Sequence, residues 1–259
     1  MPPTDKLQSK LIVVIGGTAG IGFGVAKACV EHGANVVVAG RSQQKVDGAS
    51  ERLKPAADDL SKVRGHVCDL SGPDVEANVR KLFDFATDNG QVKVHHVVST
   101  AGYMESPLAL KDTTVKDILN LCQGRIVGDV IIAKVCLKYL EPSYTSSYTL
   151  TGGLVAYKPL PGYSVRDGLS GAKDALVRSL ALEMKPMRVN LINPGAIQTD
   201  MLDQLAEKWG EGAVQQLADR AVLGRIGQPE DVAEAYLGMM KSYFTTGSIA
   251  IVDGGTLIQ

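Results

Sequence analysis

A short apolar run that leads into a glycine-rich turn constrains the fold of this chain more than any other feature. The run is LIVVI, at residues 11–15, and the residues after it read GGTAGIGFGVAKA from Gly16 onward. The glycines at positions 16, 20 and 22 follow the spacing G-x-x-x-G-x-G. A buried strand, a tight turn and a helix are expected in that order, because glycine permits the sharp bend between strand and helix. The start of such a helix favours a bound anion, since its first N–H groups are free and the helix dipole is positive there.

Strand-like runs and helix-like segments alternate along the chain. Apolar, β-branched runs begin near residues 11, 35, 62, 93, 147, 188 and 248. Several of the segments between them have apolar residues at a spacing near 3.6, which is typical of helices. The alternation predicts an α/β fold, with one Rossmann-type, doubly wound sheet of seven parallel strands and helices on both faces. We expect residues 1–10 to form an N-terminal tail and residues 11–259 to form a single domain.

Composition excludes several classes of partner. The chain has 27 basic and 28 acidic residues, so its formal charge of −1 offers no basic surface for nucleic acid. The run LIVVI is too short to span a membrane. The cysteines, at positions 29, 68, 122 and 136, lie far apart and lack the spacing of a metal site. We therefore expect a cytoplasmic protein with reduced thiols and no metal.

The glycine turn and the end of the second strand together predict a dinucleotide site. A pyrophosphate would lie on the N–H groups at the start of the first helix. The second strand ends VVVAGRS, which places Arg41 and Ser42 where such sites distinguish between cofactors. A guanidinium there can bind the 2′-phosphate of NADP, whereas a carboxylate would bind the 2′-hydroxyl of NAD. We therefore expect NADP(H); the alternative for Arg41 is an ordinary solvated arginine.

With these residues in view, the sequence resembles the short-chain dehydrogenase/reductase family over nearly its whole length. The segments VCDLSG, STAG, RVNLINPGAIQTDM, GRIGQPEDVA and GSIAIVDGG match that family. The resemblance implies a Rossmann-type oxidoreductase with a substrate lid at about residues 196–225. Together with the turn and Arg41, it implies that these residues bind the cofactor: Gly16, Thr18, Gly20, Ile21, Arg41, Ser42, Asp69, Ala101, Gly102, Lys173, Pro194, Gly195, Ile197 and Thr199.

The catalytic positions depart from the pattern of the family. Its members use an Asn, a Ser, and a Tyr four residues before a Lys, and the tyrosine gives a proton to the substrate oxygen. In this chain Arg125 stands at the asparagine position, Thr151 at the serine position and Lys173 at the lysine position. Leu169 replaces the tyrosine. The resemblance implies catalytic roles for Arg125, Thr151 and Lys173.

Other tyrosines are alternative proton donors. Tyr103, Tyr157 and Tyr163 lie on expected loops. Tyr163 precedes Lys173 by ten residues, and in a continuous helix these two residues would be roughly 15 Å apart. Tyr163 could therefore act as the proton donor only from a loop.

Arg125 needs a partner, because a guanidinium buried in a mostly apolar pocket is costly when unpaired. An anionic or carbonyl-bearing substrate would satisfy it. The alternative is that Arg125 turns outward or forms a structural bridge to an acid such as Asp129.

Because it lacks the tyrosine, the sequence also resembles a divergent branch of the family, the fungal alkaloid-pathway enzymes of the malbrancheamide and paraherquamide type. They reduce an iminium with NADPH and direct an intramolecular cycloaddition. They carry an arginine at the position of Arg125, and an aspartate where this chain has Leu160. Hydride addition to an iminium yields a neutral amine, so no proton donor is needed.

We therefore expect an NADPH-dependent reductase of an imine, an iminium or a related group in a hydrophobic small molecule of specialised metabolism. A non-redox cyclase or isomerase that uses the NADP-closed pocket is an alternative, and a nucleotide-sensing protein without catalysis is another. The segment GDVIIAKVCLKYL, at residues 128–140, is apolar on more than one face. Related enzymes pair through the equivalent helix, so a homodimer or homotetramer is expected; the alternative is a helix fully buried inside the monomer.

Overall fold

Seven parallel strands form a single sheet in the described part of the chain, which covers residues 5–102, 107–210 and 212–259 of the computed structural model. The strand order is β3-β2-β1-β4-β5-β6-β7, and each neighbouring pair is parallel. The strands are β1 (Leu11–Ile15), β2 (Asn35–Gly40), β3 (Val63–Val67), β4 (His96–Ser99), β5 (Ser147–Thr151), β6 (Arg188–Pro194) and β7 (Ile249–Val252). The predicted doubly wound sheet is confirmed. Its order reverses between β1 and β4, and ligands of such sheets bind outside the carboxyl ends of the strands at that point.

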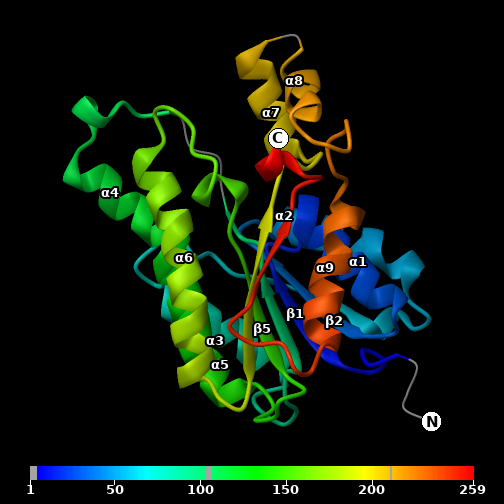
Figure 1. Ribbon diagram of the computed structural model, residues 1–259. Coiled ribbons are helices and arrows are strands. Elements are labelled where there is room, and N and C mark those ends of the chain that lie inside the picture. The colour runs from blue at the N-terminus through cyan, green and yellow to red at the C-terminus, as the bar shows by residue number, and fades with distance from the viewer. Residues whose placement is uncertain (1–4, 103–106, 211) are drawn as a thin grey trace.

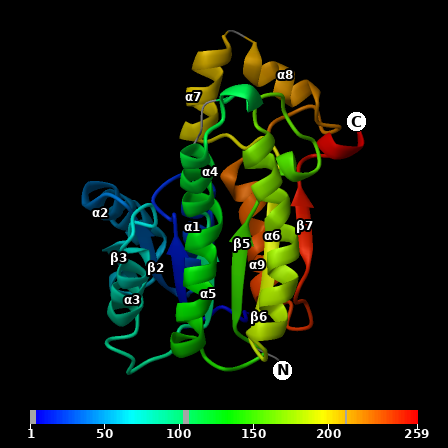
Figure 2. The same ribbon diagram turned by 90° about the vertical axis from the view of Figure 1, so that its left-hand side faces the viewer.

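Helices cover both faces of this sheet (Figure 1). The helices are α1 (Gly20–Glu31), α2 (Gln43–Leu53), α3 (Val75–Ala86), α4 (Val115–Cys122), α5 (Gly128–Tyr139), α6 (Ser164–Glu183), α7 (Asp200–Trp209), α8 (Ala213–Asp219) and α9 (Pro229–Lys241). α1, α2 and α9 pack on one face, and α3, α5 and α6 pack on the other (Figure 2). A π-helical segment, Gln123–Val127, joins α4 to α5. Short 3₁₀ turns occur at Lys54–Ala56, Leu60–Lys62, Leu110–Asp112, Leu154–Ala156 and Thr256–Ile258.

The strands supply both faces of the core by alternation of their side chains. In β1, Leu11, Val13 and Ile15 join the cluster under α3, α5 and α6, whereas Ile12 and Val14 join the cluster under α1 and α9. All five are buried, so β1 reads as a continuous apolar run rather than as an alternating one. The central strands therefore hold their carboxyl ends rigidly at one edge of the sheet.

The segment before β1 packs on the same domain. Leu7 is fully buried in the cluster under α1 and α9. The Ser9 N–H donates to the Gly33 carbonyl oxygen at 3.0 Å, and Asp5 pairs with His32. Residues 5–10 thus extend the core beside the end of α1.

The segment expected to form a lid lies beyond the carboxyl edge of the sheet. α7 and α8 fall within residues 196–225 and stand above the ends of β6 and β7 in Figure 1. Among the described helices, none combines the length and the apolar character that a membrane crossing requires.

Candidate active site and dinucleotide cleft

The glycine turn joins β1 to α1 at the reversal point of the sheet. Gly16 and Gly20 have positive φ angles of 89° and 52°, which suit glycine. A Cβ at Gly16 would lie 2.6 Å from the Ala101 backbone nitrogen, and a Cβ at Gly22 would lie 2.3 Å from the Gly16 carbonyl oxygen. A side chain at Gly16 would therefore displace the backbone after β4, and a side chain at Gly22 would displace the backbone of the turn itself.

The start of α1 has the properties of an anion site. Its N-cap residue, Ala19, makes no side-chain capping bond, and no described side chain is bonded to the first N–H groups of the helix, among them that of Ile21. A Cβ at Gly102 would meet nothing within 4 Å in the described structure, so the neighbouring β4 loop leaves space beside the turn. These residues fit a pyrophosphate, whose charge would lie at the positive end of the helix dipole.

Residues predicted to hold the cofactor converge on this turn from several strands. A Cβ at Gly20 would lie 2.9 Å from the Thr199 methyl carbon, and a Cβ at Gly40 would lie 2.7 Å from the Thr18 methyl carbon. Thr199 is the N-cap of α7, and its hydroxyl accepts from the Leu202 N–H. The start of α7 is thereby placed directly over the glycine turn.

The segment after β6 approaches the same edge. Pro194 ends β6, and a Cβ at Gly195 would lie 2.8 Å from the Cα of Asp253. Ile197 is buried and forms an isolated bridge with Gly227. These contacts fix the course of the chain from the sheet into α7.

Arg41 and Ser42 lie where β2 ends and α2 begins. Arg41 is exposed, and Ser42 is the N-cap of α2 but makes no side-chain capping bond. At the end of β3, the Asp69 carboxylate accepts from the Ser71 N–H at 2.9 Å and from its hydroxyl at 2.7 Å. These bonds lower the pKa of Asp69 below its ordinary value, and the nearby Arg41 contributes in the same direction. Asp69 is therefore ionised and held in place at neutral pH.

Lys173 belongs to a buried polar network. Its ammonium lies 2.8 Å from the Asp129 carboxylate, with the two side chains only 8% and 7% exposed, and donates to the Thr151 carbonyl oxygen at 2.9 Å. Asp129 also accepts from the Ser99 hydroxyl at 3.0 Å and from the Tyr148 hydroxyl at 3.2 Å. The alternative in which Asp129 bridges to Arg125 is therefore not the arrangement in the structure. An ammonium has three N–H donors, so one remains for a further acceptor.

The Thr151 hydroxyl, for which a catalytic role is predicted, is bonded to groups of the core. The hydroxyl donates to the Ser99 carbonyl oxygen at 2.6 Å and lies 2.5 Å from the Tyr236 hydroxyl on α9. The alternation of side chains along β5 explains the direction of the Thr151 side chain. Tyr148 and Leu150 face α5 and α6, so the odd-numbered side chains, including Thr151, face the opposite side of the sheet. Thr151 thus contributes its carbonyl oxygen to Lys173 and its side chain to the packing of α9.

The position of the missing tyrosine is helical, as expected, with Leu169 and Lys173 both within α6. Tyr163 is the N-cap of this helix, and the Arg166 guanidinium stacks 3.7 Å from its ring centroid. The Tyr157 hydroxyl donates to Asp174 at 2.5 Å, and burial together with that carboxylate raises the pKa of the phenol. Neither tyrosine is bonded to Lys173. Tyr103 lies outside the described residues.

Arg125 lies in the π-helical segment between α4 and α5 and is half-buried. Single π-helical turns within longer helices are frequent at functional sites, because the extra residue re-aims the neighbouring side chains. The adjacent Gln123 side chain donates to the carbonyl oxygens of Leu70 and Gly72, at 3.3 and 3.2 Å. The segment is thus tied to the loop after β3.

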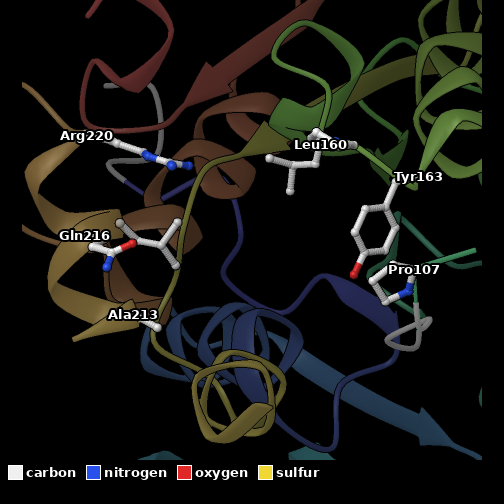
Figure 3. A pocket seen from close by; sticks show the side chains of 8 residues that line it. Pro107, Leu160, Tyr163, Ala213, Gln216 and Arg220 are labelled. Atoms are coloured by element: carbon white, nitrogen blue, oxygen red, sulfur yellow. The ribbon is translucent and has the colours of Figure 1, made fainter. Parts of the chain in front are cut away.

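A cavity of about 300 Å³ opens between α8 and the loop before α6 (Figure 3). Leu160, Pro161 and Tyr163 line it from that loop, with Pro107 beside them. Its opposite wall comes from α8 and the residue after it, namely Ala213, Gln216, Leu217 and Arg220. The Leu108 N–H donates to the Gly162 carbonyl oxygen at 2.9 Å, which joins the two segments of the first wall.

Sequence reasoning missed Asp129 as the partner of Lys173, and it missed Ser99, Tyr148 and Tyr236 altogether. Asp129 had a detectable signal, since it is the one carboxylate in the segment GDVIIAKVCLKY of α5. The two tyrosines are fully buried, and burial is the main cause that raises the pKa of each phenol. They stabilise the network from within the core and are not exposed to a substrate.

The fold and the cleft define a dinucleotide-binding α/β protein, and comparison with known proteins gives its family. The family described as "SDR-like rossmann domain" matches residues 4–259. The chain is 40% identical to the short-chain dehydrogenase/reductase ucsE of an Acremonium species, over 98% of this chain and 97% of the relative. The chain belongs to the short-chain dehydrogenase/reductase family.

Other relatives differ in their described activities. The short-chain dehydrogenase/reductase malC of Malbranchea aurantiaca is 38% identical over the full length of both chains. A solved structure described as the MalC reductase/Diels-Alderase from that organism matches with a TM-score of 0.92, over 98% of this chain and 99% of the other. Carbonyl reductase family member 4 of Danio rerio is 31% identical over 96% of this chain and 98% of the relative.

Proposed function

We propose that the protein is an NADPH-dependent reductase that acts on an imine or iminium group of a hydrophobic small molecule in natural-product biosynthesis. The observation that carries this proposal is the surroundings of Lys173. Leu169 stands four residues earlier, and the ammonium pairs with Asp129 instead of with a phenol. A ketone needs a proton as hydride arrives, whereas an iminium becomes a neutral amine without one. The similarity to the fungal enzymes malC and ucsE supports the same class of pathway.

The chain's own residues bind and orient in this proposal. The uncapped start of α1 holds the pyrophosphate, and the remaining N–H of Lys173 binds a ribose hydroxyl. Arg125 holds a carbonyl or anionic group of the substrate from the π-helical segment. Leu169 presents an apolar surface to the reacting group. The chemistry that NADPH supplies is hydride transfer, and its rate depends on how closely the acceptor carbon is held.

A matched pair of probes tests the reaction type. 3,4-Dihydroisoquinoline and α-tetralone are bicyclic compounds of similar size, one with an imine and the other with a ketone. We expect the protein to oxidise NADPH with the imine and not with the ketone, as followed by NADPH absorbance. Faster turnover of the ketone would contradict the proposal, as would tight NADPH binding without turnover across a panel of imines.

The preference for NADPH is proposed from Arg41 and Ser42. Arg41 is exposed at the end of β2, and the Ser42 hydroxyl makes no capping bond, so both can reach a 2′-phosphate. Arg41→Asp is expected to weaken NADPH binding and to favour NADH. Lys27→Asp, on an exposed part of α1, is the control for the change in charge. An unchanged ratio of the two dissociation constants in Arg41→Asp would remove Arg41 from the site.

A second candidate is a cyclase or isomerase that needs the nucleotide only to close the pocket. The similarity to a structure described as a reductase/Diels-Alderase favours keeping it. Product formed from a substrate in the presence of redox-inert NADP⁺ alone would identify this activity. Product that forms only with NADPH would identify the reductase.

The assembly and the location of the protein belong to the same proposal. Val130 and Leu137 of α5 are 39% and 57% exposed, and Val115 and Leu119 of α4 are also exposed. A second copy of the chain covering these helices would give a homodimer or homotetramer. Light scattering after size-exclusion chromatography tests this, and a monomer at micromolar concentration would refute it. We propose a cytoplasmic location on the basis of the separate, unpaired cysteines.

A further inference from the structure

The cavity between α8 and the loop before α6 is lined by both polar and apolar side chains. Pro107, Leu160, Pro161, Ala213 and Leu217 supply its apolar part. In Figure 3, Arg220 extends from one side toward the opening, and Tyr163 points its hydroxyl into the opening from the other. Its volume of about 300 Å³ is at the lower end of the range for small-molecule pockets, so it suits one end of a ligand.

Arg220 forms no ion pair with any described residue of the chain. The neighbouring Asp219 carboxylate accepts instead from the Gln215 side chain at 2.7 Å. The other arginine of the lid, Arg225, is paired with Asp231 at 2.6 Å. The guanidinium of Arg220 therefore retains its donors for a group within the cavity, and a guanidinium binds a carboxylate through two parallel hydrogen bonds.

The opposite wall is held rigidly. Tyr163 is 7% exposed, and its ring is covered by the Arg166 guanidinium. Arg166 is in turn bonded to Asp167 at 2.7 Å, and Asp167 accepts from the Leu160 N–H at 3.0 Å. This chain of contacts fixes Leu160 and the Tyr163 phenol relative to α6, so the cavity is formed before a ligand enters.

We propose that this cavity binds the carboxylate end of the substrate, with Arg220 as the anion-binding group and Leu160 and Leu217 against the adjoining apolar part. This inference rests on the proposed function, because it names the class of substrate for the same site: an amphipathic molecule with a reducible group and a terminal carboxylate. Tyr163 adds a neutral hydrogen-bond donor on the far side. An arginine at the substrate side of the lid thus selects acids over their neutral derivatives.

A binding experiment tests the inference without hydride transfer. The probes are 4-phenylbutanoate and 4-phenylbutanamide, which differ in charge and scarcely in shape, titrated calorimetrically into protein saturated with NADP⁺. We expect the carboxylate to bind about tenfold more tightly than the amide, which is a difference of about 1.4 kcal/mol. The preference should weaken with added salt, because Arg220 is exposed.

Variants locate the effect. Arg220→Gln is expected to abolish the preference for the carboxylate and Arg220→Lys to retain part of it. Lys208→Gln removes the same charge from an exposed position on α7 and should leave it unchanged. Equal binding of the two probes, no binding of either, or a preference that survives in Arg220→Gln would overturn the inference. NADPH oxidation with imines is measured separately, so failure of the proposed reaction is distinguishable from failure of this site.

Discussion

Replacing Asp129 by asparagine keeps the shape of the side chain and removes the charge that neutralises Lys173. Both side chains are less than a tenth exposed, so the ammonium would remain buried without a counter-charge. Removal of one partner of a buried ion pair costs about 3–5 kcal/mol. With an m-value of about 3 kcal/mol/M, the urea midpoint of Asp129→Asn is expected to fall by roughly 1 to 1.7 M.

The control is an ion pair of similar length at the surface. Lys54 and Glu51 are 2.5 Å apart on α2 and the following turn, and the Glu51 side chain is 70% exposed. Glu51→Gln is expected to cost less than about 1 kcal/mol, because water screens the pair. A double variant, Asp129→Leu with Lys173→Met, should recover much of the loss, since it leaves no buried charge. If Asp129→Asn shifts the midpoint no more than Glu51→Gln does, the pair is solvated and the reasoning fails.

Three further changes have expected outcomes. Leu169→Tyr should add ketone reduction by placing a phenol one helical turn before Lys173, measured as NADPH oxidation with α-tetralone. Gly22→Ala should cost about 1–3 kcal/mol and weaken NADPH binding, because its Cβ meets the Gly16 carbonyl oxygen. Gly48→Ala, where an added Cβ meets nothing within 4 Å, should raise the free energy of unfolding by about 0.5–1 kcal/mol. The stabilities of the two glycine variants are measured by urea unfolding. Arg225 and the Gln228 N–H lower the pKa of Asp231 from 3.8 to about 2. The ionised carboxylate therefore stabilises the fold above pH 3.8, and this contribution disappears as the pH falls toward 2. Asp231→Asn should accordingly lower the free energy of unfolding by under about 1 kcal/mol above pH 3.8 and leave it unchanged near pH 2.

These predictions can be contradicted individually. No ketone turnover by Leu169→Tyr would mean that Asp129 holds Lys173 out of reach of a phenol. Equal urea midpoints for Gly22→Ala and Gly48→Ala would mean that the turn relaxes freely. A destabilisation by Asp231→Asn that persists at pH 2 would assign the effect to packing instead of charge.

The sheet and the glycine turn were predictable because each depends on local sequence. The seven runs that were expected to be strands became the seven strands. The reason is clearest for β1, which is buried along its whole length and needs apolar residues throughout. Tyr163 was expected on the loop before α6 and lies at its N-cap, where Pro161 and Gly162 precede it. The N-terminal segment was harder, because the polar composition of residues 5–10 conceals the buried side chain of Leu7.

Contacts between distant elements were not predictable from the sequence. Asp129 and Lys173 lie on different helices and meet only because β4 and β5 place α5 beside α6. The direction of the Thr151 hydroxyl depends on the phase of alternation at the very end of β5, which a shift of one residue would reverse. The π-helical segment around Arg125 has no compositional signature, since it differs from an α-helix only in its hydrogen-bond spacing.

The pairing of Lys173 with Asp129 and the presence of Leu169 are physically consistent with each other. In the usual arrangement of the family the lysine lowers the pKa of the catalytic phenol. In this chain no phenol stands there, and a buried ammonium without a counter-charge would be costly and would repel a cationic substrate. Asp129 removes both difficulties, because it neutralises Lys173 within the core and is itself held by Ser99 and Tyr148. A site arranged in this way can still position a ribose through Lys173, and it admits an iminium more readily than a site with a free lysine would.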